Sequence, residues 1–258
     1  MKKINLRLLL IVFLLFSLGL GAGIFFLMSP FVKEIELLRQ GHIQIELKKG
    51  DSPHYHIIKK IPKGYVALSE IPFHVSHAIL VSEDWSFYLH AGMDFHQLRK
   101  ALRENLRGKR HMRGASTITQ QLIKNLFLTH EKTLWRKLKE AILSLYLELR
   151  LPKKKILELY LNAIQYGDNI YGIQQAAYYY FNRPVSELSA KEGAFLAMLL
   201  PNPVRYAESF KQKMLTPYAE KTMAQILFKM KIAGFISSKD YFRETNKVLW
   251  QTQDVLSE

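Results

Sequence analysis

The feature that most constrains this chain is an uncharged apolar run over residues 8–28, which reads LLLIVFLLFSLGLGAGIFFLM. A helix of about 20 apolar residues crosses the hydrocarbon core of a bilayer. The alternative is a cleaved signal peptide, whose apolar region would be shorter and would lead directly into a small-x-small cleavage site. Here the run is followed by SPFVKEIE. The run therefore predicts a single transmembrane helix.

The charges on either side of this run predict its orientation. Lys2, Lys3 and Arg7 precede it, whereas the segment that follows has Lys33 balanced by acidic neighbours. Basic residues favour the cytoplasmic side of a membrane. We therefore expect a single-pass membrane protein with a cytoplasmic amino terminus, whose folded part lies on the extracytoplasmic side.

The length and the local pattern of the chain predict three regions. At 258 residues the chain supports one sizeable core. Residues 1–29 are expected to form the cytoplasmic amino terminus and the anchor. Residues 30–63 are expected to form a stalk with one short strand, because HIQIELK alternates between apolar and polar residues. Residues 64–258 are then the main folded domain.

Helical spacing dominates the third region, so the fold class is predicted to be mainly α. Apolar residues recur at intervals of three and four over 132–151, and a second stripe follows Pro152 over 153–164. Ser189 with Glu192 three residues later predicts a capping box, with a helix that runs to about Leu200. Residues 214–235 and 238–250 predict two further helices.

Charge and composition exclude several classes of function. The chain has a net charge of +15 and no cysteine, so disulfides, thiolate zinc sites and a cysteine nucleophile are absent. Residues 97–155 hold 16 lysines and arginines against 4 acidic residues. Such a segment suits anionic lipid headgroups, a phosphorylated substrate or nucleic acid, although a solvated helical face is the commoner explanation. The extracytoplasmic location excludes nucleic acid and leaves membrane phosphates.

Two adjacent carboxylates stand among aromatic residues in SEDWSFYLHAGMD, residues 82–94. Glu83 and Asp84 could be buried structural ions, metal ligands, or a base whose pKa is raised by poor solvation. The pattern by itself leaves these three interpretations open.

A second unusual stretch is GASTITQQLIKN, residues 114–125, where polar side chains crowd a segment of helical tendency. One helix cap, at Ser116 or Thr117, does not need so many hydroxyls and amides. We expect a turn into a helix whose amino terminus also contacts a sugar or a phosphate. The polar side chains are those of Ser116, Thr117, Thr119, Gln120 and Gln121.

Basic residues follow at helical spacing, beginning with Lys124. Lys132, Arg136 and Glu140 are four apart and share one face of a helix. They could form an ordinary surface ladder, or a cationic seat for a pyrophosphate with a carboxylate beside it. Spacing does not decide between these.

Together the motifs resemble one family, the monofunctional biosynthetic peptidoglycan glycosyltransferases, also called murein transglycosylases. The resemblance rests on ordered blocks between residues 71 and 206. They are EDWSFYLHAG, GASTITQQ, RKLKE, KKKILELYLN, and YGIQQAAYYYF with ELSAKEGAFLAMLLPNP. Asn182 stands where the family usually has glycine, and Gly193 interrupts a helix that is usually richer in alanine. We expect Asn182 to tolerate a left-handed turn and Gly193 to permit close packing.

The resemblance implies a lysozyme-like helical fold and an activity. The enzyme would polymerise lipid II into linear glycan strands by inverting β-1,4 glycosyl transfer, with release of polyprenyl pyrophosphate. The implied partners are lipid II, the growing glycan strand, membrane lipids and the cell-wall synthesis machinery. The alternatives are a lysozyme-like hydrolase or lytic transglycosylase, and a non-catalytic, anchored lipid-binding scaffold.

The resemblance also implies roles for single residues. Glu83 matches the general base, and Asp84 supports it by capping a helix or by bonding to His90 or to the GASTITQQ backbone. Glu140 would lie by the leaving pyrophosphate and hold a divalent cation such as Mg²⁺ or Mn²⁺, or orient basic side chains; no cofactor is expected to be tightly bound. The phosphates would be neutralised by Lys124, Lys132, Arg136, Lys137 and Lys139, and the donor side would be lined by Ser116, Thr117, Gln120 and Gln121.

Two further expectations concern neighbouring segments. Glu158 and Asn162 are expected to brace the cleft rather than to take part in the chemistry. The basic segment 99–113 is expected to gate the donor side or to lie on anionic headgroups.

Overall fold

Helices form most of the structure, as the sequence predicts. A computed structural model describes residues 6–48, 52–106, 116–129, 131 and 133–250. The long helices are α1 Leu6–Leu38, α2 Phe73–Glu83, α3 Phe95–Leu106, α4 Ile118–Phe127, α5 Leu134–Arg150, α6 Lys153–Ala163, α7 Ile173–Phe181, α8 Ala190–Leu199, α11 Pro217–Ile232 and α12 Ser238–Asn246. The short elements are α9 Pro203–Tyr206, α10 Glu208–Lys211, the 3-10 turns Leu68–Glu70, Phe87–Leu89 and Val185–Glu187, and the strands β1 His42–Glu46, β2 His54–Ile58, β3 Gln165–Gly167 and β4 Ile170–Tyr171.

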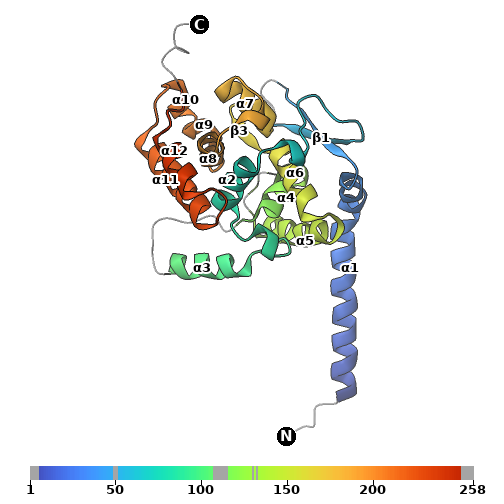
Figure 1. Ribbon diagram of the computed structural model, residues 1–258. Coiled ribbons are helices and arrows are strands. Elements are labelled where there is room, and N and C mark those ends of the chain that lie inside the picture. Colours follow the sequence, from blue (N-terminus) through green and yellow to red (C-terminus); the bar gives the residue numbers. More distant parts are fainter. Residues whose placement is uncertain (1–5, 49–51, 107–115, 130, 132, 251–258) are drawn as a thin grey trace.

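Two groups of helices share one hydrophobic core (Figure 1). Helix α2 packs on α8 and α11, and α4 packs on α5 and α6. Close approach of α2 and α8 depends on Gly193, because a Cβ atom there would lie 2.9 Å from Val75 Cα. The expectation that Gly193 permits close packing is therefore confirmed.

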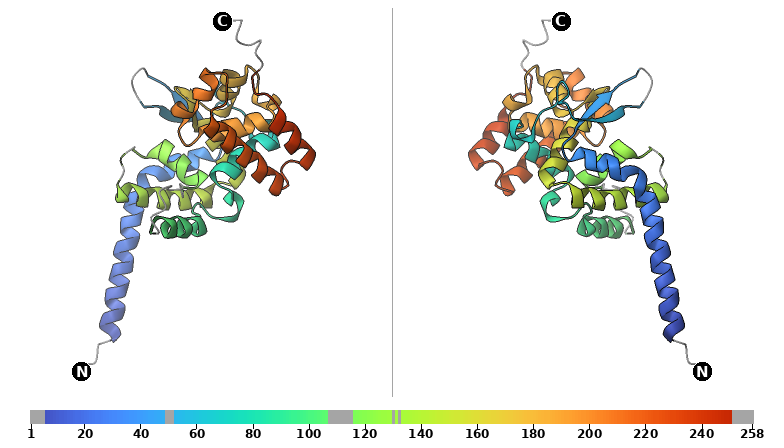
Figure 2. Two further views of the ribbon diagram at one scale, coloured as in Figure 1. Left: turned by 90° about the vertical axis from the view of Figure 1, so that its left-hand side faces the viewer. Right: turned by 90° about the vertical axis from the view of Figure 1, so that its right-hand side faces the viewer.

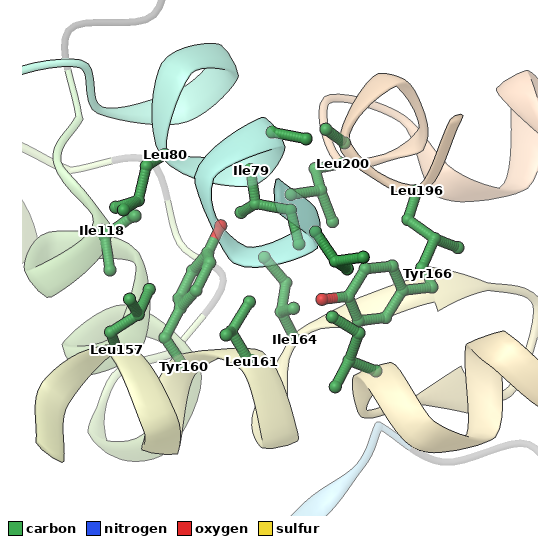
Figure 3. Packing of buried hydrophobic residues seen from close by; sticks show 14 of the residues in the cluster. Ile79, Leu80, Ile118, Leu157, Tyr160, Leu161, Ile164, Tyr166, Leu196 and Leu200 are labelled. Carbon is green, nitrogen blue, oxygen red and sulfur yellow. The ribbon is translucent and has the colours of Figure 1, made fainter. Parts of the chain in front are cut away.

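Aromatic and branched side chains fill the centre of the core (Figure 3). Tyr160 rises from α6 and Tyr166 extends from β3, and both rings lie among apolar side chains that include Ile79 of α2. This packing fixes α2, whose last residue is Glu83, against α6.

Helix α1 leaves the globular part of the protein along its amino-terminal half (Figure 2). Residues Ile11–Leu38 are long and apolar enough to cross a membrane, by length and composition. Large apolar side chains are exposed there, with Phe13 70% and Phe26 74% exposed. Water is a poor environment for such a surface, and a bilayer would cover it.

The segment expected to be a stalk packs onto the rest of the fold. Ile35 and Leu38, in the last turns of α1, are buried, and the Glu36 carboxylate pairs with Arg150 at the end of α5. The predicted strand exists as β1 and pairs antiparallel with β2. Its Ile43 joins the common core. The boundary predicted at residue 63 therefore does not coincide with a break in the packing.

The local signals of the sequence place most helix ends correctly. Ser189 and Glu192 form the predicted capping box at the start of α8. Asn182 ends α7 in the left-handed conformation, with φ 53°. The last helix is shorter than predicted, because α12 stops at Asn246 and Trp250 instead packs edge-to-face on Phe195.

Candidate active site

The carboxyl end of α2, the amino end of α4 and the last turn of α11 border a cleft of about 580 Å³. Both acidic residues of the first motif line it, together with polar side chains of the second. The residues that line the cleft include Glu83, Asp84, Ser116, Thr117, Gln121, Lys124 and Lys229. The structure therefore brings together in one cavity motifs that the sequence presents separately.

Glu83 is the last residue of α2 and is partly buried. Burial raises the pKa of Glu83, and the charge of Asp84 raises it further. The Gln121 side chain opposes this rise by donating from Nε2 to Glu83 Oε2 at 2.9 Å, as do the positive charges of Lys124 and Lys229. The result is a poorly solvated carboxylate that borders a cavity, which suits a general base.

Asp84, which follows α2, connects this end of the helix to His90 and to the start of α4. Its buried carboxylate accepts from His90 Nε2 at 2.9 Å and from the backbone N–H of Ile118 at 3.0 Å. The Ile118 N–H lies in the first turn of α4, so it has no partner within the helix itself. A negative charge such as that of Asp84 is favourable at this position. Both expected partners of Asp84 are found, since Ile118 belongs to the GASTITQQ backbone.

Thr117 caps α4 and is itself fixed by the first motif. Its Oγ1 accepts from the backbone N–H of Gln120 at 3.2 Å and donates to the Gly92 carbonyl at 2.7 Å. The Gln120 side chain returns a bond to the Thr117 N–H, which completes a capping box. Gln120 is thus buried in the cap and does not line the cleft, whereas Ser116 and Gln121 do.

A cluster of charges around the buried Glu140 lies next to Ser116. Glu140 is 2% exposed and accepts from Arg136 Nη1 at 2.7 Å and from Lys137 Nζ. Lys137 Nζ also donates to Ser116 Oγ at 3.2 Å, which connects the cluster to the cleft. Glu140 therefore holds the Arg136 and Lys137 side chains in place, and Lys137 connects this group to the lining of the cleft.

Lys124 stands between Glu83 and this cluster. Burial lowers the pKa of Lys124, the charges of Arg136 and Lys137 lower it further, and the carboxylates of Glu140 and Glu83 oppose the change. An ammonium that is partly desolvated in this way interacts strongly with an anion.

The donor set around Glu140 does not fit a divalent cation. Both of its carboxylate oxygens already accept from basic side chains. Within the described part of the chain, no group of three acidic, histidine or cysteine residues is arranged to hold a metal. Mg²⁺ and Ca²⁺ prefer sites with oxygen ligands and without adjacent cations.

Some predicted residues lie elsewhere. Lys139 extends over the Trp135 ring, with Nζ 5.6 Å from its centroid, and does not line the cleft. Lys132 lies outside the described residues. Of the basic segment 99–113, residues 99–106 belong to α3 and the remainder also lies outside them.

The fourth motif braces the wall of the fold, as expected. Glu158 accepts from the Tyr65 hydroxyl at 2.9 Å and from the Leu68 N–H at 3.0 Å. Asn162 pairs with both backbone groups of Val66. Neither side chain lines the cleft.

Lys229 is the site residue that the sequence analysis missed. It comes from α11, which the sequence marked only as a packing helix, and it lines the cleft and lowers the pKa of Glu83. No motif surrounds it, so only the packing of α11 on α2 could reveal its position.

The fold and the cleft define a mainly helical protein with a poorly solvated carboxylate, Glu83, near a cluster of cations. The transglycosylase family model matches residues 53–231, and the chain belongs to this family. The family predicted from the sequence motifs is thus confirmed.

Curated relatives support the assignment. The biosynthetic peptidoglycan transglycosylase of Nitrosospira multiformis is 40% identical over 66% of this chain and 72% of its own. That of Nitrosomonas eutropha is 41% identical over 59% of this chain and 62% of its own. Penicillin-binding protein 1A of Aquifex aeolicus is 42% identical over 72% of this chain, and the match spans only 25% of that larger protein. A solved structure of penicillin-binding protein 1A from Haemophilus influenzae covers 81% of this chain and 21% of its own, with 18% identity and a TM-score of 0.39, too low to carry an argument.

Proposed function

We propose that this protein polymerises lipid II into linear glycan strands of peptidoglycan by inverting β-1,4 glycosyl transfer. The observation that carries the proposal is that Glu83 and Lys124 line one cleft. The Glu140 cluster is connected to this cleft by the hydrogen bond from Lys137 to Ser116. A base and a seat for a departing anion thus share one cavity, in a member of the transglycosylase family.

In the proposed reaction, Glu83 takes the proton from the 4-hydroxyl of the acceptor N-acetylglucosamine. The hydroxyl oxygen forms a bond to the anomeric carbon of the donor strand as the bond from that carbon to the phosphate oxygen breaks. Polyprenyl pyrophosphate leaves, and its phosphate oxygen keeps the electron pair of the broken bond. Because a sugar hydroxyl is a weak nucleophile, a positioned carboxylate contributes to the rate.

The leaving group gains negative charge as the glycosidic bond breaks. Lys124 lines the cleft, and Lys137, which Glu140 holds in place together with Arg136, contacts Ser116 of the cleft lining. Preorganised charges aimed at developing charge are among the strongest contributors to catalysis. We assign this role to the cluster in place of a bound metal.

The proposed location follows from α1 and from the substrate. A single-pass helix with a cytoplasmic amino terminus would hold the domain on the extracytoplasmic face of a bacterial inner membrane, where lipid II and membrane phosphates are accessible. The proposed partners are lipid II, the growing strand, membrane lipids and other cell-wall synthesis proteins.

The test is incubation of the full chain in detergent with labelled lipid II. We expect a polymer that muramidase degrades, and we expect Glu83→Gln to lose this activity while it keeps its affinity for lipid II. Glu187→Gln is the matched control, because Glu187 is exposed and lies outside the cleft.

The rival functions give different results in the same assay. Shortening of pre-made glycan strands, without polymer from lipid II, would indicate a hydrolase or lytic transglycosylase. Lipid affinity with no turnover in wild type would indicate a scaffold. Either result would refute the proposal.

A further inference from the structure

A buried chain of hydrogen bonds runs from the core to the base. The Tyr160 hydroxyl of α6 donates to Gln121 Oε1 at 3.0 Å, and Gln121 Nε2 donates to Glu83 Oε2 at 2.9 Å. These hydrogen bonds therefore join three helices, because Tyr160 lies on α6, Gln121 lies on α4 and Glu83 ends α2. The tyrosine lies on the core side of this line and is not part of the cleft lining.

The two bonds together set which way the Gln121 amide faces, because the Tyr160 hydroxyl donates to its oxygen and the Glu83 carboxylate only accepts. The oxygen and nitrogen ends of a glutamine amide are nearly equal in shape, so packing alone does not distinguish them. Tyr160 is 0% exposed and its pKa is raised by burial, so the hydroxyl stays protonated and acts as a donor. A donor at this position binds the amide oxygen and turns the amide nitrogen toward Glu83.

The ring of Tyr160 is held firmly enough to do this. It lies among Ile118, Leu157 and Leu161, with its hydroxyl at the end of the ring nearest α2 (Figure 3). A phenylalanine would fill the same space without burying a polar atom. Since burying a hydroxyl is unfavourable unless it forms a hydrogen bond, the bond to Gln121 accounts for the tyrosine.

We propose that Tyr160 is a positioning residue for the general base, acting through Gln121 to keep a hydrogen-bond donor on Glu83. The inference rests on the proposed function, in which Glu83 accepts a proton. The proposal also gives Gln121 a different role from the one predicted from the sequence, which placed this residue on the donor side. Its amide nitrogen instead donates a hydrogen bond to the general base. Glu83 is then both aimed at the cleft and kept ionised in a poorly solvated position.

Other charged and titratable groups face Glu83 and stay in place when the relay is cut. They are Asp84 beside it, Lys124 of α4, Lys229 and Tyr218 of α11, and Tyr166 of β3. These groups are common to wild type and to Tyr160→Phe, so a difference between these two proteins reports the relay.

The test is Tyr160→Phe in the full chain, with two readouts. In the lipid II assay we expect the acid limb of the pH–rate profile to move up by about one pH unit, because one hydrogen bond to the charged form is lost or reversed. Below the midpoint the rate should fall about tenfold, with KM changed less than about twofold. The second readout is labelling of Glu83 by a water-soluble carbodiimide at a series of pH values, followed by peptide mass spectrometry. Its midpoint should rise by the same amount.

Tyr166→Phe is the matched control. It also removes a buried hydroxyl near Glu83, but that hydroxyl has no hydrogen-bond partner within the described part of the chain. We expect its labelling midpoint to equal that of wild type. A double-mutant cycle adds a second control: in a Gln121→Met background, Tyr160→Phe should cause no further shift, because its action passes through the amide.

Three results would overturn the relay. They are an unchanged midpoint in folded Tyr160→Phe, an equal shift in Tyr166→Phe, or a full additional shift in the Gln121→Met background. Because labelling needs no lipid II, absence of polymer in wild type would refute the proposed function and would leave the labelling result on the relay intact.

Discussion

Replacement of Glu140 by glutamine tests whether the cationic seat is organised by one buried acid. The carboxylate is the common acceptor of Arg136 and Lys137, and it opposes the lowering of the Lys124 pKa. A neutral amide leaves three cations near one another without their counter-charge. We expect Glu140→Gln to be less stable and to bind the donor pyrophosphate poorly.

The contacts give the magnitude. The Arg136 side chain is 17% exposed in its pair with Glu140, so this charge-assisted bond contributes about 2 kcal/mol. The Lys137 side chain is 44% exposed, and solvent screening reduces its pair to below about 1 kcal/mol. The sum, about 2–3 kcal/mol, corresponds to a fall in Tm of roughly 5–10 °C for a domain of this size.

The assay combines thermal unfolding with polymerisation of lipid II. Glu208→Gln is the matched control, because Glu208 pairs with Lys211 at the same spacing but at 4.0 Å on the exposed surface. Its Tm should change by less than about 1 °C, since exposed pairs contribute little. If Glu140→Gln retained the Tm and the rate of wild type, the cluster would not organise the site. If activity of wild type depended on a divalent cation and Glu140→Gln abolished that dependence, Glu140 would be a metal ligand instead.

Further predictions concern the base, its support and the packing behind it. Because burial raises the pKa of Glu83, the folded state loses stability as pH rises through that pKa. Glu83→Gln should therefore be inactive, yet its Tm at pH 7 should equal or exceed that of wild type. The difference in Tm should vanish in acid, where Glu83 of the wild type is protonated. A lower Tm of the variant at pH 7 would contradict this. Asp84→Asn, which loses its charge toward His90, should lower the free energy of unfolding by about 2 kcal/mol in denaturant titration and the polymerisation rate at least about tenfold, and wild-type values for both would refute its supporting role. Gly193→Ala should destabilise by about 1–3 kcal/mol, because the new methyl group meets Val75, despite a gain in helix propensity of up to about 1 kcal/mol; a more stable variant would show that α2 and α8 can separate freely.

The sequence by itself determined the features that depend on neighbours along the chain. The apolar spacing of α5 and α6 and the capping pairs Thr117–Gln120 and Ser189–Glu192 are set within one or two helical turns. Local patterns of this kind are readable because the interacting groups are three or four residues apart. Motif order identified the family, and the resemblance predicted roles for Glu83 and Asp84.

Only the tertiary structure decided which side chains meet. Gln121 contacts Glu83 because α4 packs on α6 and thereby lies next to the end of α2. Lys229 reaches the cleft because α11 packs on α2. The packing of residues 30–48 and 52–63 on the rest of the fold and the burial of Trp250 depend on the same kind of contact. These partners are distant in sequence, and their meeting is fixed by the shape of the shared core, which no local pattern records.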